Sequence, residues 1–144
     1  MSSRLARLER YRKARERTWP RISIRAFEQL VAEALDDLPP YVQERLENVA
    51  VIVEKWPTVE QLGRMSDDPD FDLLGLYEGI NRLERGGGYH LVTPDRITLF
   101  WRPIVEEVGM GGADALREEI RKTVIHEVAH HFGINDAELE RLGG

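Results

Sequence analysis

Leu116–Gly133 reads LREEIRKTVIHEVAHHFG, a helical stretch with the pattern H-E-x-x-H at its centre, formed by His126, Glu127 and His130. Residues four apart lie on one face of an α-helix, so both imidazoles can reach a single metal ion. Glu127 is rotated by about 100° from His126, which places its carboxylate where a base can take a proton from a metal-bound water. The pattern therefore predicts a zinc hydrolase with two histidine ligands and Glu127 as the catalytic residue.

The motif extends beyond the second histidine to Gly133 and Asp136, giving H-E-x-x-H-x-x-G-x-x-D. A glycine can take the left-handed conformation that ends a helix, and the chain can then turn back and bring Asp136 under the histidines. With Asp136 as third ligand, one Zn²⁺ ion keeps its fourth position open for water, as in catalytic sites. Alternatively, Asp136 caps a last helix over residues 137–142, and Glu138 or Glu140 supplies the third ligand.

Length and composition favour a single domain outside the membrane. The chain has 144 residues, no cysteine and no apolar stretch near the ~20 residues of a membrane span. Its basic N-terminus is not followed by an apolar run, so it does not read as a signal peptide. The lack of cysteine excludes disulfides and a thiol nucleophile. We therefore expect a cytoplasmic protein without a membrane-bound segment.

Charge separates the chain into two parts. Residues 1–25 contain nine Arg and Lys against two Glu, a net charge of +7, whereas the remainder has a net charge of −13. Residues 1–22 are expected to be a basic N-terminal extension, helical or disordered, and residues 23–144 the folded domain. Contact of this arm with nucleic acid stays open, although it lacks the interleaved aromatic residues of a stacking surface. Nothing in the sequence predicts an oligomeric state.

Hydrophobic periodicity predicts an α+β fold in which a small, three- to four-stranded sheet packs on helices, including the H-E-x-x-H helix beneath it. Helices are expected over residues 23–38, 41–45 and 103–108, strands over 48–55, 73–80 and 96–101, and loops over 57–70 and 82–90. We expect the polar loop over 57–70 to be mobile. The strand over 96–101 has the strongest β propensity. It is a candidate for the sheet edge beside the cleft, where an extended peptide could bind, with an ordinary internal strand as the alternative.

Three further residues are candidates for contacting a substrate. Tyr77 could donate a hydrogen bond to a developing oxyanion, and Leu99 lies on the strand expected beside the cleft. His90 follows a run of three glycines and is either a substrate contact or simply exposed. His131 points about 100° away from His130, so it cannot share the ion but could pack near the cleft. Thr123 lies three residues before His126 and could brace the site.

Several stretches resemble the small bacterial zincin-like metallopeptidase family, a group of minimal single-domain zincins. The stretches that show the resemblance are Leu74–Gly79, Ile97–Phe100 and Thr123–Asp136. The resemblance covers about residues 25–144. It implies a minimal zincin-like fold, zinc bound by His126, His130 and Asp136, Glu127 as the catalytic acid and base, and a peptide or protein substrate. The extended motif is also similar to that of the metzincins, although no methionine follows it in this sequence.

Two other functions remain open at this point. The first is a non-catalytic binding module that keeps zinc for stability. The second is a metal-dependent endoribonuclease, since a bacterial enzyme of ribosomal RNA processing has a similar H-x-x-x-H-x-x-G-x-x-H arrangement. Glu127 and Asp136 both differ from that arrangement and favour the peptidase.

Overall fold

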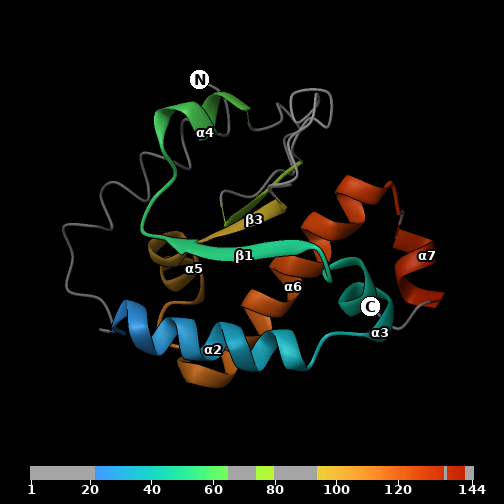
Figure 1. Ribbon diagram of the computed structural model, residues 1–144. Coiled ribbons are helices and arrows are strands. Elements are labelled where there is room, and N and C mark those ends of the chain that lie inside the picture. The colour runs from blue at the N-terminus through green and yellow to red at the C-terminus, as the bar shows by residue number, and fades with distance from the viewer. Residues whose placement is uncertain (1–21, 65–73, 80–93, 135, 142–144) are drawn as a thin grey trace.

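The computed structural model describes residues 22–64, 74–79, 94–134 and 136–141, and Figure 1 shows how their helices and strands are arranged. Residues 1–21 of the predicted basic arm and the predicted loop over 82–90, with His90, lie outside these residues. The elements are α2 (Ile24–Asp36), α3 (Pro40–Arg45), β1 (Val49–Glu54), α4 (Val59–Arg64), β2 (Gly75–Glu78), β3 (Asp95–Phe100), α5 (Trp101–Val108), α6 (Gly112–Phe132) and α7 (Asp136–Arg141).

Helix α2 begins and ends close to where its residues predict. The Ser23 hydroxyl accepts a hydrogen bond from the Ala26 N–H at 3.0 Å, the usual N-cap contact. One face of the helix is buried, with apolar residues at helical spacing: Phe27, Leu30, Val31 and Ala34. The helix ends at Asp36, ahead of two consecutive prolines, the second of which opens α3.

The segment predicted as a mobile loop over 57–70 contains a helix, so that prediction was wrong where the structure describes it. Helix α4 spans Val59–Arg64. Its first turn is closed by a capping box. The Gln61 N–H donates to the Thr58 hydroxyl at 3.1 Å, and the Thr58 N–H donates to the Gln61 side-chain oxygen at 2.8 Å. The Thr-x-x-Gln spacing was the local signal for this helix.

The three strands form one sheet in the order β1-β3-β2. Strand β1 is parallel to β3, and β2 is antiparallel to it, with Gly75 opposite Leu99 and Tyr77 opposite Ile97. The prediction of β3 as the edge beside the cleft was therefore wrong, because β3 pairs on both sides. Among the described strands, β1 and β2 are the two edges. Strand β2 is the one that packs on the H-E-x-x-H helix.

Helix α6 lies under the sheet, as predicted, and packs on β2, β3, α2 and α5 (Figure 1). The prediction of an α+β fold with a small sheet on helices is confirmed. The largest fully buried side chains come from both layers: Phe27, Val42, Leu74, Ile97, Leu99, Phe100, Ile104, Val105, Ile120 and Val124. No described helix is long and apolar enough to cross a membrane.

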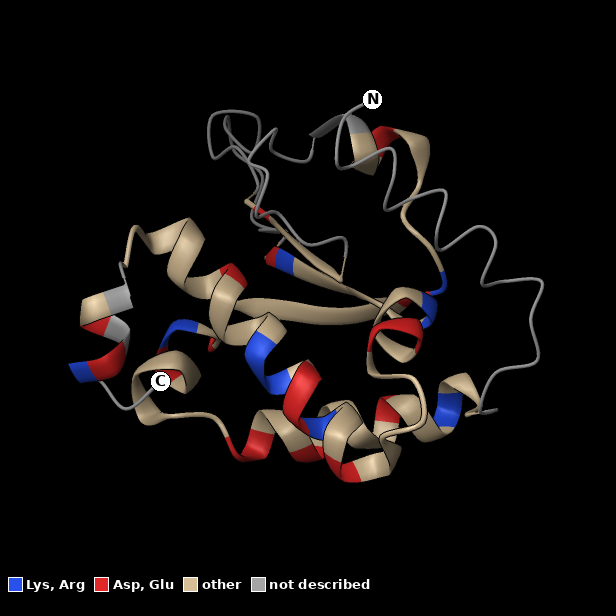
Figure 2. Ribbon diagram, turned by 180° about the vertical axis from the view of Figure 1, so that it is seen from behind, with Lys and Arg blue, Asp and Glu red and all other residues tan. Residues whose placement is uncertain are grey.

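Charged residues divide α6 into two halves, as Figure 2 shows. The N-terminal half is marked by acidic and basic residues and runs beside α2, where Arg117 pairs with Glu33 at 3.0 Å. The C-terminal half is mostly uncharged and contains the H-E-x-x-H motif. The first half therefore pairs with α2 through charged side chains, while the second half faces the sheet edge and has few charged residues.

Candidate active site

The two histidines of the motif lie on one exposed face near the end of α6. Both side chains are exposed, and their ring centroids are 6.4 Å apart. Exposed imidazoles can turn about their side-chain torsions, so one nitrogen from each ring can be directed at a common ion. The chemistry of this pair, two neutral nitrogen donors one turn apart, fits zinc.

Gly133 ends α6 as predicted, in the left-handed conformation with φ 71° and ψ 28°. The Ile134 N–H donates to the Ala129 carbonyl at 2.8 Å, and the Gly133 N–H donates to the His130 carbonyl at 3.3 Å. This is the Schellman arrangement, which satisfies the last carbonyls of a helix and turns the chain away from its axis. Helix α7 follows, beginning at Asp136, one residue before the predicted start.

The third ligand is not settled by the described side chains. Asp136 is the first residue of α7, but its side chain lies outside the described part of the structure. Within that part, no three His, Asp or Glu side chains are grouped to hold one ion. The structure thus brings His126 and His130 together and leaves Asp136 as a prediction.

Glu127 turns inward, between the histidine face and the sheet. Its side chain is only 6% exposed, although it is acidic. One carboxylate oxygen, Oε1, accepts a hydrogen bond from the backbone N–H of Tyr77 at 3.0 Å. A buried carboxylate needs such partners, since desolvation of its charge is otherwise costly. The carboxylate thereby joins helix α6 to strand β2.

The hydrogen-bond pattern of the sheet explains why this N–H is available to Glu127. The Phe100 N–H donates to the Leu74 carbonyl at 2.9 Å, so Leu74 and Phe100 form a hydrogen-bonded pair. Such pairs alternate along an antiparallel ladder, which makes Leu76 and Glu78 the next residues of β2 that bond to β3. The backbone groups of Gly75 and Tyr77 consequently point to the outer edge, toward α6.

Gly75 allows β2 to come this close to the helix. A Cβ atom at Gly75 would lie 2.8 Å from the Thr123 Cγ2 methyl and 3.3 Å from the Thr98 carbonyl oxygen. Thr123 itself is nearly buried, and its hydroxyl donates to the Glu119 carbonyl at 2.8 Å. Thr123 therefore supports the site by packing against the edge strand. The missing side chain in the Leu-Gly-Leu-Tyr stretch was the sequence signal for this contact.

Tyr77 is held at its ring and at its hydroxyl. The His131 imidazole stacks on the ring with a centroid separation of 3.8 Å and an interplanar angle of 17°. The hydroxyl donates to the Asp95 carboxylate at 3.0 Å, so it is directed at Asp95 and not at a substrate oxyanion. Burial, with the hydrogen bond and charge of Asp95, raises the pKa of Tyr77 to about 12. Asp95 was not among the predicted site residues.

Leu99 does not lie where a substrate could touch its side chain. It is fully buried at the centre of β3, opposite Gly75, so its prediction as a substrate contact was wrong. Strong β propensity marks a buried central strand as readily as an edge, which is the physical reason for the error.

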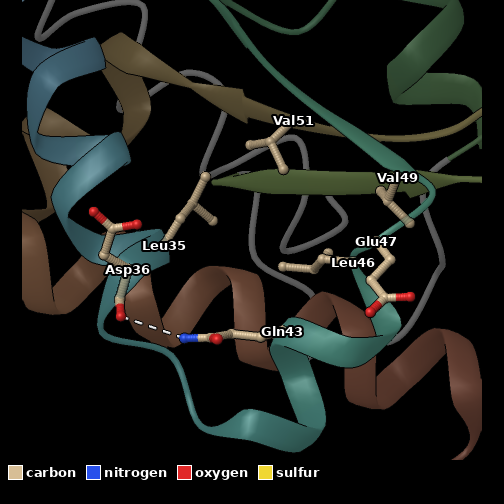
Figure 3. A pocket seen from close by; sticks show the side chains of 7 residues that line it. All are labelled: Leu35, Asp36, Gln43, Leu46, Glu47, Val49 and Val51. Carbon is tan, nitrogen blue, oxygen red and sulfur yellow. Dashed lines mark hydrogen bonds between the residues drawn. The ribbon is translucent and has the colours of Figure 1, made fainter.

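A pocket of about 500 Å³ lies away from this site, between α2, α3 and the edge strand β1 (Figure 3). Its lining combines apolar and polar side chains: Leu35, Asp36, Gln43, Leu46, Glu47, Val49 and Val51. Gln43 closes one side by donating to the Asp36 carbonyl at 3.3 Å and to the Leu38 carbonyl at 2.8 Å. None of the motif residues lines this pocket, so it is separate from the candidate active site.

Comparison with protein families agrees with the geometry of α6 and β2. A model of the zincin-like metallopeptidases matches residues 46–144, more than half of the chain, and includes the whole H-E-x-x-H helix and its edge strand. No curated protein matches the chain. By this match, the chain belongs to the zincin-like metallopeptidase family.

Proposed function

We propose that residues 23–144 form a zinc-dependent peptidase domain in which Glu127 is the catalytic acid and base. The observation that supports this most is the position of the Glu127 carboxylate, 3.0 Å from the Tyr77 N–H and next to the histidine face. A base there lies between a metal held by the histidines and a peptide held along β2. Family membership supports hydrolysis of a peptide bond.

His126, His130 and Asp136 would hold the ion. When bound, zinc supplies Lewis acidity and lowers the pKa of a coordinated water to about 7. The left-handed turn at Gly133 and the start of α7 at Asp136 favour Asp136 as the third ligand. Glu138 and Glu140 follow on the same short helix and are the alternatives.

The outer edge of β2 suits an extended peptide. The carbonyls of Gly75 and Tyr77 and the Gly75 N–H face this edge, where a substrate strand can pair through its main chain. The Tyr77 N–H already donates to Glu127, so the substrate would bond to the two carbonyls and to the Gly75 N–H. Glu127 then takes a proton from the attacking water and returns it to the leaving amine.

Two variants test this proposal together with metal analysis of the full chain. Glu127→Gln should bind zinc like the wild type and lose turnover of unfolded peptides by at least ~10²-fold, since the amide cannot accept the proton. His126→Ala should bind zinc much more weakly. If Glu127→Gln keeps full activity, Glu127 is not the base.

The same assay decides between the alternative functions. Zinc binding without peptide hydrolysis would favour a non-catalytic binding module, and deletion of residues 1–22 would show whether the basic arm blocks the site. Cleavage of RNA by the metal-loaded protein, with none of peptides, would favour the endoribonuclease.

A further inference from the structure

The ring, the hydroxyl and the backbone N–H of Tyr77 each have a partner on α6 or β3. Its ring is stacked on His131 at 3.8 Å, and its hydroxyl is bonded to Asp95 at 3.0 Å. Its backbone N–H is bonded to Glu127 at 3.0 Å. One residue therefore connects the end of the metal helix, the start of β3 and the carboxylate proposed as the base.

The side-chain contacts restrict the backbone of Tyr77. A ring that is stacked on an imidazole and hydrogen-bonded at its far end to a carboxylate loses both contacts if it leaves its rotamer. Residue 79 leaves little room for movement on this side, because a Cβ at Gly79 would come within 3.3 Å of the His131 Cε1 atom. The direction of the Tyr77 N–H is consequently fixed relative to α6.

The fixed N–H in turn orients the carboxylate. A glutamate side chain has three torsions, and a charge-assisted hydrogen bond to a rigid donor removes most of that freedom for Glu127. Gly75 lies so close to Thr123 that a Cβ would not fit between them, and this close approach keeps β2 near the helix and the Tyr77 N–H within reach of the carboxylate. A base held in one position before the substrate arrives reacts faster than one that must first be ordered.

We propose that Tyr77 is a positioning residue that holds the Glu127 carboxylate in its reactive orientation, and that His131 supports it through the ring stack. This inference rests on the proposed function in taking Glu127 as the base. The hydrogen bond itself does not depend on any activity, and it can be measured in the protein without metal.

Amide hydrogen exchange by NMR on the full chain tests the hydrogen bond directly. The Tyr77 N–H should be protected in the wild type and should exchange at least ~10-fold faster in Glu127→Ala, because Glu127 is its acceptor. The N–H groups of Leu76 and Glu78 point to β3 and should keep their protection, which makes them internal controls. Unchanged protection of the Tyr77 N–H in Glu127→Ala overturns the proposal.

A matched pair of variants tests the contribution of His131. His131→Ala removes the stack and should speed exchange of the Tyr77 N–H, whereas His131→Phe keeps an aromatic ring there and should restore protection. In peptide hydrolysis, His131→Ala should lower kcat ~10- to 100-fold and change KM less than ~3-fold, and His131→Phe should recover most of kcat. If neither measurement changes in His131→Ala, or if Phe fails to restore them, the stack does not position the base.

The two kinds of measurement separate this inference from the proposed function. A protein that hydrolyses no peptide, yet loses Tyr77 protection in Glu127→Ala and His131→Ala, has the positioning contacts but a different activity. A protein that hydrolyses peptides with an unprotected Tyr77 N–H is a peptidase whose base is held by other groups.

Discussion

Gly75→Ala should destabilise the protein mainly through the contact between strand β2 and helix α6. The new Cβ would lie 2.8 Å from the Thr123 Cγ2 atom, whereas carbon atoms in contact are ordinarily ~3.5–4.0 Å apart. The strand and helix must therefore separate by roughly 0.7 Å or more, or Thr123 must leave its rotamer. Rotation of Thr123 is opposed, because its hydroxyl is bonded to the Glu119 carbonyl at 2.8 Å.

The expected cost follows from two opposing terms. Overpacking a core contact costs about 1–3 kcal/mol, and replacing glycine by alanine recovers about 0.4–1 kcal/mol from the unfolded chain. We expect a net loss of about 1–2 kcal/mol in the free energy of unfolding. Urea titration followed by circular dichroism measures this free energy. An unchanged m-value would show that the same surface is exposed on unfolding as in the wild type.

Thr123→Ser provides the matched control, because serine keeps the hydroxyl and lacks the Cγ2 methyl. In the double variant with Gly75→Ala the clash with the methyl group is absent, and the milder approach to the Thr98 carbonyl oxygen at 3.3 Å remains. The second substitution should then cost less than about 0.5 kcal/mol relative to Thr123→Ser alone, so the two sites should be coupled by ~1 kcal/mol. A Gly75→Ala protein as stable as the wild type, or purely additive substitutions, would refute the close approach of β2 to α6.

Two further predictions concern Leu99 and Tyr77. Leu99→Ala should lower the free energy of unfolding by about 2–5 kcal/mol in urea titration, because Leu99 is fully buried. The KM for a peptide should stay unchanged. A raised KM with unchanged stability would show that Leu99 contacts the substrate. The pKa of Tyr77 is raised from 10.0 to about 12 in the folded protein. The neutral phenol therefore stabilises the folded state below pH 10, and this contribution to the free energy of unfolding is lost as pH rises toward 12. In Tyr77→Phe this loss of stability with pH, about 1 kcal/mol after allowance for solvent screening, should be absent. If the free energy of unfolding falls equally in both proteins between pH 10 and 12, the prediction is contradicted.

Local rules predicted the elements that depend on neighbours in sequence. Ser23 caps α2, Gly133 ends α6 in a left-handed turn, and the four-residue spacing brings His126 and His130 to one face. These features involve residues within about one helical turn of each other, so the sequence is sufficient. Helix α4 was missed although its Thr58–Gln61 capping box is equally local, because the polar composition of residues 57–70 favours a loop.

The sequence alone determined the helix, its motif and the general kind of chemistry, because a helix positions its own side chains. Only the tertiary structure decided that β2, and not β3, is the edge on that helix, and that the Glu127 carboxylate meets the Tyr77 N–H fifty residues earlier in the chain. Strand order depends on pairings between distant segments, and β-branched and aromatic residues mark a strand without showing whether it lies at an edge or at the centre of the sheet. The side chains of Tyr77, His131 and Asp95 acquire a joint role only when β2, β3 and α6 pack together.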